Sequence, residues 1–335
     1  MTSAPRSAGD SGPSGSGPWG SGGVPRGGTV PGRTVAPRVS TPPPPEPLPA
    51  DAFDSHCHLD LIERPVPEVL ADARAARITR VVTIGVDLPT SRWAARCADA
   101  HPDVYAAVAI HPNETARATG SAAERDPAAR DPAARDPADR GPADRDPADR
   151  DTVLAEIGSL AALPRVRAVG ETGLDYYRDS APREVQRDWF RAHIEIAKQA
   201  GKALMIHDRD AHEDVLRILA ADGPPEHVIF HCFSGDAAMA KRCAEAGYVM
   251  SFAGNVTFSS AQPLRDAAAA APADLILAET DAPFLTPAPN RGRPNSPAMV
   301  AHTVRAIAEV KQMDVAELCA AVTATGERVF GPWAR

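Results

Sequence analysis

The stretch Ala52-Phe53-Asp54-Ser55-His56-Cys57-His58 forms the first strand-like run of the chain and ends in two histidines. Successive side chains of a strand point to opposite faces, so His56 and His58 project to the same side. Four later apolar runs also end in residues that can bind a metal, in the motifs Gly170-Glu171, Ile206-His207, Phe230-His231 and Glu279-Thr280-Asp281. Imidazole and carboxylate groups gathered from several strands suit divalent metals. The pattern indicates metal-assisted hydrolysis.

Strand-like and helix-like segments alternate along most of the chain. Eight short apolar runs are expected to be strands, at residues 52–56, 80–85, 104–110, 166–170, 203–206, 227–230, 248–252 and 274–278. Helical patterns are expected at residues 66–76, 91–100, 182–199, 213–220, 237–245, 297–312 and 315–330. This alternation favours an α/β fold in which a parallel sheet closes as a single (β/α)8 barrel. The polar motifs then lie at the carboxyl ends of the strands, where such barrels carry their active sites.

Two segments have a composition unlike that of globular protein. Residues 1–50 are rich in Gly, Ser and Pro, and we expect a disordered tail because they offer little apolar surface to bury. Residues 120–151 contain an Arg-Asp-Pro-Ala repeat with a five-residue step. Proline at that spacing excludes a regular helix or a central strand, so we expect a disordered loop insertion. The predicted barrel occupies residues 51–335.

Charge and composition limit the surroundings in which the protein works. The net charge is −8, of which residues 1–50 contribute +2 and residues 121–151 contribute −3, leaving −7 for the rest. An acidic body argues against nonspecific duplex binding through a broad basic face. We find no secretion signal and no membrane-spanning stretch, and the five cysteines are odd in number and form no Cys-x-x-Cys motif. A cytoplasmic location without a membrane or an obligate protein partner is therefore expected.

The strand-end residues suggest a centre with two divalent ions. His56, His58 and Asp281 would hold one ion, and His207 and His231 the other. Glu171 would bridge the two ions. Paired ions can polarise a phosphoryl oxygen and activate water. Asp281 would also orient that water and accept its proton. Ligand type leaves Mg, Mn and Zn open.

Substrate contacts are expected around the same end of the barrel. His111 ends the third strand before Pro112, and it either meets the substrate or only fixes the loop. Arg178, Arg209 and Arg291 follow the fourth, fifth and eighth strands, where guanidinium groups can grip phosphate oxygens. Ordinary surface arginines are the alternative. Tyr176 and Tyr177 offer a weaker candidate for stacking on a base.

Taken together, the motifs resemble those of the TatD family of metal-dependent hydrolases over residues 53–331. The resemblance rests on six segments: Asp54-Ser55-His56-Cys57-His58-Leu59-Asp60, Ala109-Ile110-His111-Pro112, Gly170-Glu171-Thr172-Gly173-Leu174-Asp175, His207-Asp208-Arg209-Asp210-Ala211, His231-Cys232-Phe233-Ser234-Gly235 and Glu279-Thr280-Asp281-Ala282-Pro283-Phe284-Leu285. It implies a TIM barrel of the amidohydrolase-like superfamily. It also implies the ligand set His56, His58, Glu171, His207, His231 and Asp281.

The resemblance further implies a deoxyribonuclease that cleaves DNA phosphodiester bonds in the 3′-to-5′ direction, on single-stranded or frayed 3′ ends. Asn113 and Asn290 stand where this family often has histidine, which bears on substrate preference. The same metals could activate water against a carbonyl, so an ester hydrolase such as a D-aminoacyl-tRNA deacylase is the alternative enzyme. A non-catalytic scaffold is the third hypothesis, and the six intact ligand positions argue against it.

Overall fold

In the computed structural model, eight parallel strands form one sheet in the order of the sequence, and the structure describes residues 41–118 and 149–332. The strands are β1 (Ala52–Cys57), β2 (Ile78–Ile84), β3 (Val104–Val108), β4 (Val166–Asp175), β5 (Ala203–Arg209), β6 (Val228–Phe230), β7 (Val249–Phe252) and β8 (Ile276–Ala278). A parallel bridge between Cys57 and Ala282 joins the segment after β8 to β1. The sheet therefore closes almost completely into a barrel.

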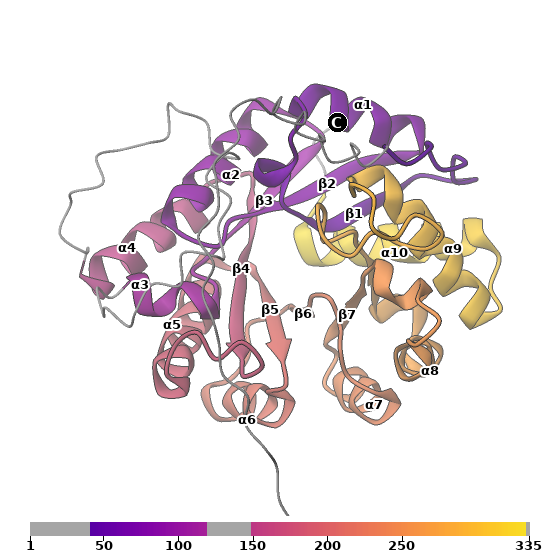
Figure 1. Cartoon of the computed structure of the whole chain (residues 1–335). Helices are drawn as coiled ribbons and strands as arrows, with labels where there is room; N and C mark the ends of the chain where they lie inside the picture. Colours follow the sequence, from indigo (N-terminus) through magenta and orange to yellow (C-terminus); the bar gives the residue numbers. More distant parts are fainter. Residues whose placement is uncertain (1–40, 119–148, 333–335) are drawn as a thin grey trace, which may run out of the picture. The chain divides into compact units, whose positions relative to one another are not determined.

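Helices surround the strands, as Figure 1 shows. They are α1 (Val66–Ala75), α2 (Leu88–Ala100), α3 (Thr115–Ala118), α4 (Arg150–Ala161), α5 (Arg183–Ala200), α6 (His212–Asp222), α7 (Ala237–Glu245), α8 (Gln262–Ala270), α9 (Val300–Lys311) and α10 (Val315–Phe330). Short 3-10 turns are η1 (Leu59–Leu61), η2 (Pro112–Glu114), η6 (Gly254–Thr257), η7 (Ala273–Leu275) and η8 (Pro297–Met299). The predicted (β/α)8 barrel is confirmed.

Alternate strand residues fill the interior of the barrel. The inward set includes Val82 and Ile84 of β2, Tyr105 and Ala107 of β3, and Ala203 and Met205 of β5, all buried in one apolar cluster. Val329 and Phe330 at the end of α10 belong to the same cluster, next to Phe53 of β1. Helix α10 thus covers the end of the barrel at which the strands begin, and the functional groups gather at the other end.

The folded segment starts earlier than the sequence indicates. Residues 41–50, expected to belong to the disordered tail, include buried Pro42, Pro45 and Leu48. The Leu48 amide donates to the Ala76 carbonyl, and the Arg305 guanidinium donates to the Pro47 carbonyl. These contacts fix the segment beside α1 and α9. The expected disorder of residues 1–40 and 119–148 concerns parts of the chain outside the described residues.

The other end of the expected insertion also differs from the structure. Arg150 and Asp151, assigned to the repeat, form the first turn of α4.

Within the described ranges, none of the helices combines the length and the apolar character needed to cross a bilayer.

Candidate metal centre

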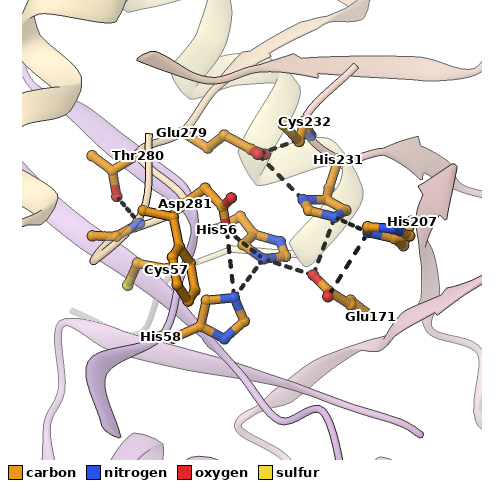
Figure 2. Close-up of polar contacts among 12 residues, drawn as sticks. His56, Cys57, His58, Glu171, His207, His231, Cys232, Glu279, Thr280 and Asp281 are labelled. Atoms are coloured by element: carbon orange, nitrogen blue, oxygen red, sulfur yellow. Dashed lines mark hydrogen bonds and ion pairs between the residues drawn. The ribbon is translucent and has the colours of Figure 1, made fainter. Parts of the chain in front are cut away.

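His56 near the end of β1 and His58 directly after it point into the same cluster of side chains, as expected (Figure 2). The two Nε2 atoms lie 3.4 Å apart. Asp281 Oδ1 lies 3.6 Å from His56 Nε2 and 3.4 Å from His58 Nε2. The donor atoms of these three residues therefore converge on one point, and they are the set expected for the first ion.

Glu171 lies at the centre of the cluster and contacts four histidines, which belong to or directly follow β1, β3, β5 and β6. Its Oε2 is 3.0 Å from His56 Nε2 and 3.1 Å from His231 Nε2. Its Oε1 is 2.9 Å from His111 Nε2 and 4.0 Å from His207 Nδ1. A single buried carboxylate thus joins the histidines of β1 to those on the opposite side of the mouth, in the central position expected for a bridging group.

His207 and His231 are each oriented by a second carboxylate. Asp175 Oδ2 lies 3.2 Å from His207 Nε2, and Glu279 Oε1 lies 3.3 Å from His231 Nδ1. An imidazole that donates one N–H to a carboxylate offers a lone pair on the other nitrogen. The free nitrogens, His207 Nδ1 and His231 Nε2, face each other at 3.2 Å and both point toward Glu171.

This geometry suits a cation. Glu279 Oε2 is buried and forms no hydrogen bond with another described residue, and Glu171 Oε2 is buried with only the imidazole nitrogens of His56 and His231 near it. Three groups of donor atoms each fit within 4.8 Å: His56, His58 and Asp281; His56, His231 and Glu279; His111, Glu171 and His207. Buried lone pairs and negative charges without donors are costly unless positive charge joins them. Nitrogen and carboxylate oxygen donors are those that divalent transition metals bind.

The pKa values of the cluster show that its carboxylates favour positive charge on the neighbouring histidines. Burial alone would lower the pKa of His58 and His231, but the carboxylates around them raise both pKa values to about 9. Hydrogen bonding to Asp281 is the leading cause at His58, and the charge of Glu171 is at His231. Burial would raise the pKa of Glu171, yet the charges of His231 and His111 hold it well below the usual range. Glu171 therefore stays ionised at the centre of the cluster.

The backbone after β8 holds Asp281 in place. Its amide donates to the His56 carbonyl at 2.9 Å, and its φ of 52° lies in the left-handed region. Asp54, fully buried on β1, accepts hydrogen bonds from the amide and the hydroxyl of Thr280. Burial raises the pKa of the Asp54 carboxyl well above its usual value, although the hydrogen bonds from Thr280 oppose this. The network ties the Asp281 segment to β1.

Of the four expected substrate-binding residues, His111 lies inside the cluster and the three arginines lie outside it. His111 is buried, contacts Glu171 through Nε2, and accepts a hydrogen bond from the Asn113 amide through Nδ1. It therefore both belongs to the cluster and fixes its loop. Arg178 is exposed after β4, Arg209 stacks on Tyr177 with its Cζ 4.0 Å from the ring centroid, and Arg291 stacks on Phe258 at 4.0 Å. All three surround the mouth.

Asp175 and Glu279 are the members that sequence reasoning missed. Strand β4 was expected to end at residue 170, but it continues to Asp175. Its last part pairs with β5, with Gly173 opposite His207 and Asp175 opposite Arg209. The quoted motif Glu171-Thr172-Gly173-Leu174-Asp175 contained the signal, since residues 171, 173 and 175 share one face of a strand. Glu279 stands two positions before Asp281 in a motif already singled out for metal binding.

Comparisons with known proteins agree with this geometry. The family model described as "TatD related DNase" matches residues 53–331. The "Uncharacterized metal-dependent hydrolase TatD" of Mycobacterium tuberculosis is 40% identical over 287 residues, covering 83% of this chain and 97% of that protein. The "Uncharacterized metal-dependent hydrolase YabD" of Bacillus subtilis is 35% identical over 282 residues, covering 83% of this chain and 98% of that protein.

A solved structure is similar in fold. The TatD homolog YjjV of Escherichia coli superposes with a TM-score of 0.69 at 22% identity, over 84% of this chain and 98% of that chain. The extent of the family match, the identity to full-length relatives and the His and carboxylate cluster at the barrel mouth lead to one conclusion. The chain belongs to the TatD family and is a metal-dependent hydrolase.

Proposed function

We propose that this protein is a deoxyribonuclease that hydrolyses phosphodiester bonds of DNA from 3′ ends, with two divalent ions in its barrel mouth. The observation that supports DNA most directly is the distribution of unpaired arginines. Among the described residues, four arginine side chains form no hydrogen bond or ion pair with another described residue: Arg178, Arg209, Arg291 and Arg293. Arg209 is the last residue of β5, and the other three lie on segments that follow β4 or β8, at the end of the barrel that carries the His and carboxylate cluster.

The other described arginines are engaged elsewhere by carboxylates, carbonyls or other groups. A guanidinium with free N–H groups beside an anionic pocket is suited to a ligand that carries several anionic oxygens, as a phosphodiester chain does. The family model that matches the chain is described as a DNase, which supports the same substrate class.

In the proposed mechanism, His56, His58 and Asp281 would hold one ion, His207 and His231 would hold the other, and Glu171 would contribute to both. Bound divalent ions would polarise the phosphoryl oxygen and make water a better nucleophile near neutral pH. Asp281 orients the attacking water and accepts its proton. Its pKa is kept low by His58 and by the nearby charges of His56 and His231, against the effect of burial, so the carboxylate is ionised and able to accept a hydrogen bond from that water. Glu171 keeps the two halves of the site at a fixed separation.

Outside the cluster, Arg178, Arg209 and Arg291 hold the phosphate oxygens of the strand. His111 donates to Glu171 and so keeps that carboxylate in its central orientation while facing the substrate side of the mouth. These roles rest on the contacts described above and on the chemistry of phosphate recognition.

The test uses metal-stripped protein with Mg, Mn or Zn added in turn, and Asp281→Asn as the control. End-labelled single-stranded DNA and a D-aminoacyl-tRNA are the two substrates. Metal-dependent shortening of DNA from its 3′ end, absent in the control, is the expected result. Release of the amino acid with intact DNA would replace the nuclease with an aminoacyl-tRNA deacylase. No reaction with either substrate would overturn both.

A further inference from the structure

Large apolar side chains are exposed at few places in the described part of the protein. Three stand out: Tyr177 with 64% of its surface exposed, Phe284 with 52% and Leu163 with 43%. Leu163 precedes β4 and so belongs to the end of the barrel away from the site. Tyr177 and Phe284 follow β4 and β8, at the end where the metal cluster lies. Two of the three exposed residues therefore border the candidate active site.

Phe284 stands directly beside the candidate metal ligands. Its ring centroid lies 5.9 Å from that of His58 in an edge-on arrangement. Its amide donates to the Asp281 carbonyl at 2.8 Å, and its own carbonyl accepts a hydrogen bond from the Asn295 amide group. The ring is thus exposed although its backbone is fixed on both sides. Exposing a phenylalanine in this way costs apolar burial, which a ligand would recover.

Tyr177 lies on the opposite side of the mouth, because β4 and β5 face β8 and β1 across the barrel. Its amide donates to Asp175 Oδ1 at 3.1 Å, which fixes its backbone close to the carboxylate that orients His207. The Arg209 guanidinium lies against one face of the ring. The Arg291 guanidinium lies likewise against Phe258, which follows β7. Two pairs of an aromatic ring and an arginine therefore lie at this end of the barrel, one at the ends of β4 and β5 and one after β7 and β8.

The charge of the protein makes this arrangement informative. With −7 on the chain outside its tail and insertion, long-range attraction contributes little to holding a polyanion. Short-range contacts must hold the strand, and stacking of bases on aromatic rings provides such contacts without sequence preference. A base within a duplex has both faces covered by its neighbours, whereas a terminal or unpaired base has a free face. The aromatic rings therefore fit a strand with unstacked bases.

We propose that Phe284 stacks on the base of the nucleotide whose phosphate lies at the metal cluster, and that Tyr177 with Arg209 holds a second nucleotide of the same single strand across the mouth. This inference rests on the proposed function and adds the part of the substrate that each ring contacts. It makes Phe284 a substrate-binding residue and the source of discrimination against paired ends.

The experiment compares wild type, Phe284→Ala, Phe284→Tyr and the matched control Leu163→Ala on two single strands. One strand carries a normal 3′-terminal nucleotide, and the other carries an abasic sugar at that position. Phe284→Ala should lower kcat/KM on the normal strand by roughly 5- to 150-fold, the range for loss of one stacked base. Its activity on the abasic strand should equal that of wild type, because that strand has no base to stack. Phe284→Tyr should restore cleavage, and Leu163→Ala should match wild type on both strands.

The outcomes separate this inference from the proposed function. A wild type that cleaves the normal strand, together with a Phe284→Ala variant that cleaves it equally well, overturns the stacking role alone. An equal loss on both strands overturns it too, since the effect would then not depend on the base. A wild type that cleaves no DNA with any metal overturns the proposed function and this inference with it. Thermal midpoints of the variants check that the exposed ring is removed without loss of the fold.

Discussion

Replacement of Asp175 by Asn tests whether a carboxylate outside the expected ligand set controls the site. In the structure, Asp175 Oδ1 accepts from the amides of Tyr177 and Arg178 at 3.1 and 2.8 Å. Its Oδ2 faces His207 Nε2 at 3.2 Å and accepts from Asn113 Nδ2 at 2.9 Å. The oxygen of an asparagine at this position would accept from the amides of Tyr177 and Arg178. Its NH2 group would then face His207 Nε2 and Asn113 Nδ2, which are also donors.

The consequence for His207 can be worked out from these contacts. A donor opposite Nε2 drives the imidazole proton to Nδ1, the nitrogen that faces His231 and Glu171. That nitrogen would then carry a proton where the metal needs a lone pair. Loss of such a carboxylate–histidine contact typically weakens metal binding by about 10- to 100-fold, which corresponds to about 1.4 to 2.8 kcal/mol. The affinity for the metal ion that His207 binds should fall by this amount.

Titration calorimetry of metal-stripped protein with Mn or Zn measures the effect directly. Asp214→Asn is the matched control, because Asp214 bonds Tyr176, Arg187 and Arg217 on the outer surface of α6 and not the cluster. Circular dichroism checks that both variants fold. Equal metal affinity in wild type and folded Asp175→Asn would refute the orienting role of Asp175.

Three further changes give separate tests. Asp281→Asn should keep the fold and lose nearly all DNA hydrolysis in the presence of metal; an unimpaired variant would remove Asp281 from the mechanism. Burial lowers the pKa of His193 to about 3, so below pH 6.5 the unfolded chain binds a proton that the folded protein does not. The free energy of unfolding therefore decreases as the pH is lowered. Wild type should therefore lose about 2 kcal/mol more unfolding free energy than His193→Gln between pH 7 and pH 5 in urea titrations, and equal losses would contradict this. Gly173→Ala should lower the free energy of unfolding by about 3 kcal/mol, because its φ is 134° and a Cβ would lie 2.1 Å from the His207 carbonyl oxygen; a denaturation midpoint equal to that of wild type would exclude the clash.

The fold was predictable because its local and global signals agree. Each of the eight apolar runs became a strand, and the sequence order of the strands is also their order in the sheet. Helix α8 was missed, since Gln262–Ala270 ends in four alanines and has Leu264 as its single large apolar residue to mark a face. Helix α4 was missed as well, because Arg150 and Asp151 at its start continue the repeat in composition, while Val153 and Ile157 are buried in the core.

The site was predictable at the residues that directly end a strand and less so elsewhere. His56, His58, Glu171, His207, His231 and Asp281 all lie in one cluster, while their individual roles as ligands stay predictions. Asp175 was hidden by the expected end of β4 at residue 170. The contact between His111 and Glu171 depends on how far two strands extend, which no local pattern specifies. The stacking of Arg209 on Tyr177 likewise joins the end of β5 to the segment after β4, and neither stretch of sequence indicates it alone.

The hydrogen bonds between β1 and the segment after β8 also bear on how the protein folds. The Asp281 amide bonds the His56 carbonyl, and the His58 amide bonds the Ala282 carbonyl, so residues 56 and 281 meet across a separation of 225 positions. Closing a loop of that length is entropically unfavourable and is expected late in folding. His56, His58 and Asp281 come together only at that step, so a chain that stops before β8 has no complete site. Metal that binds these residues would stabilise the closed barrel alone, and opening of the barrel and loss of the site would be one event.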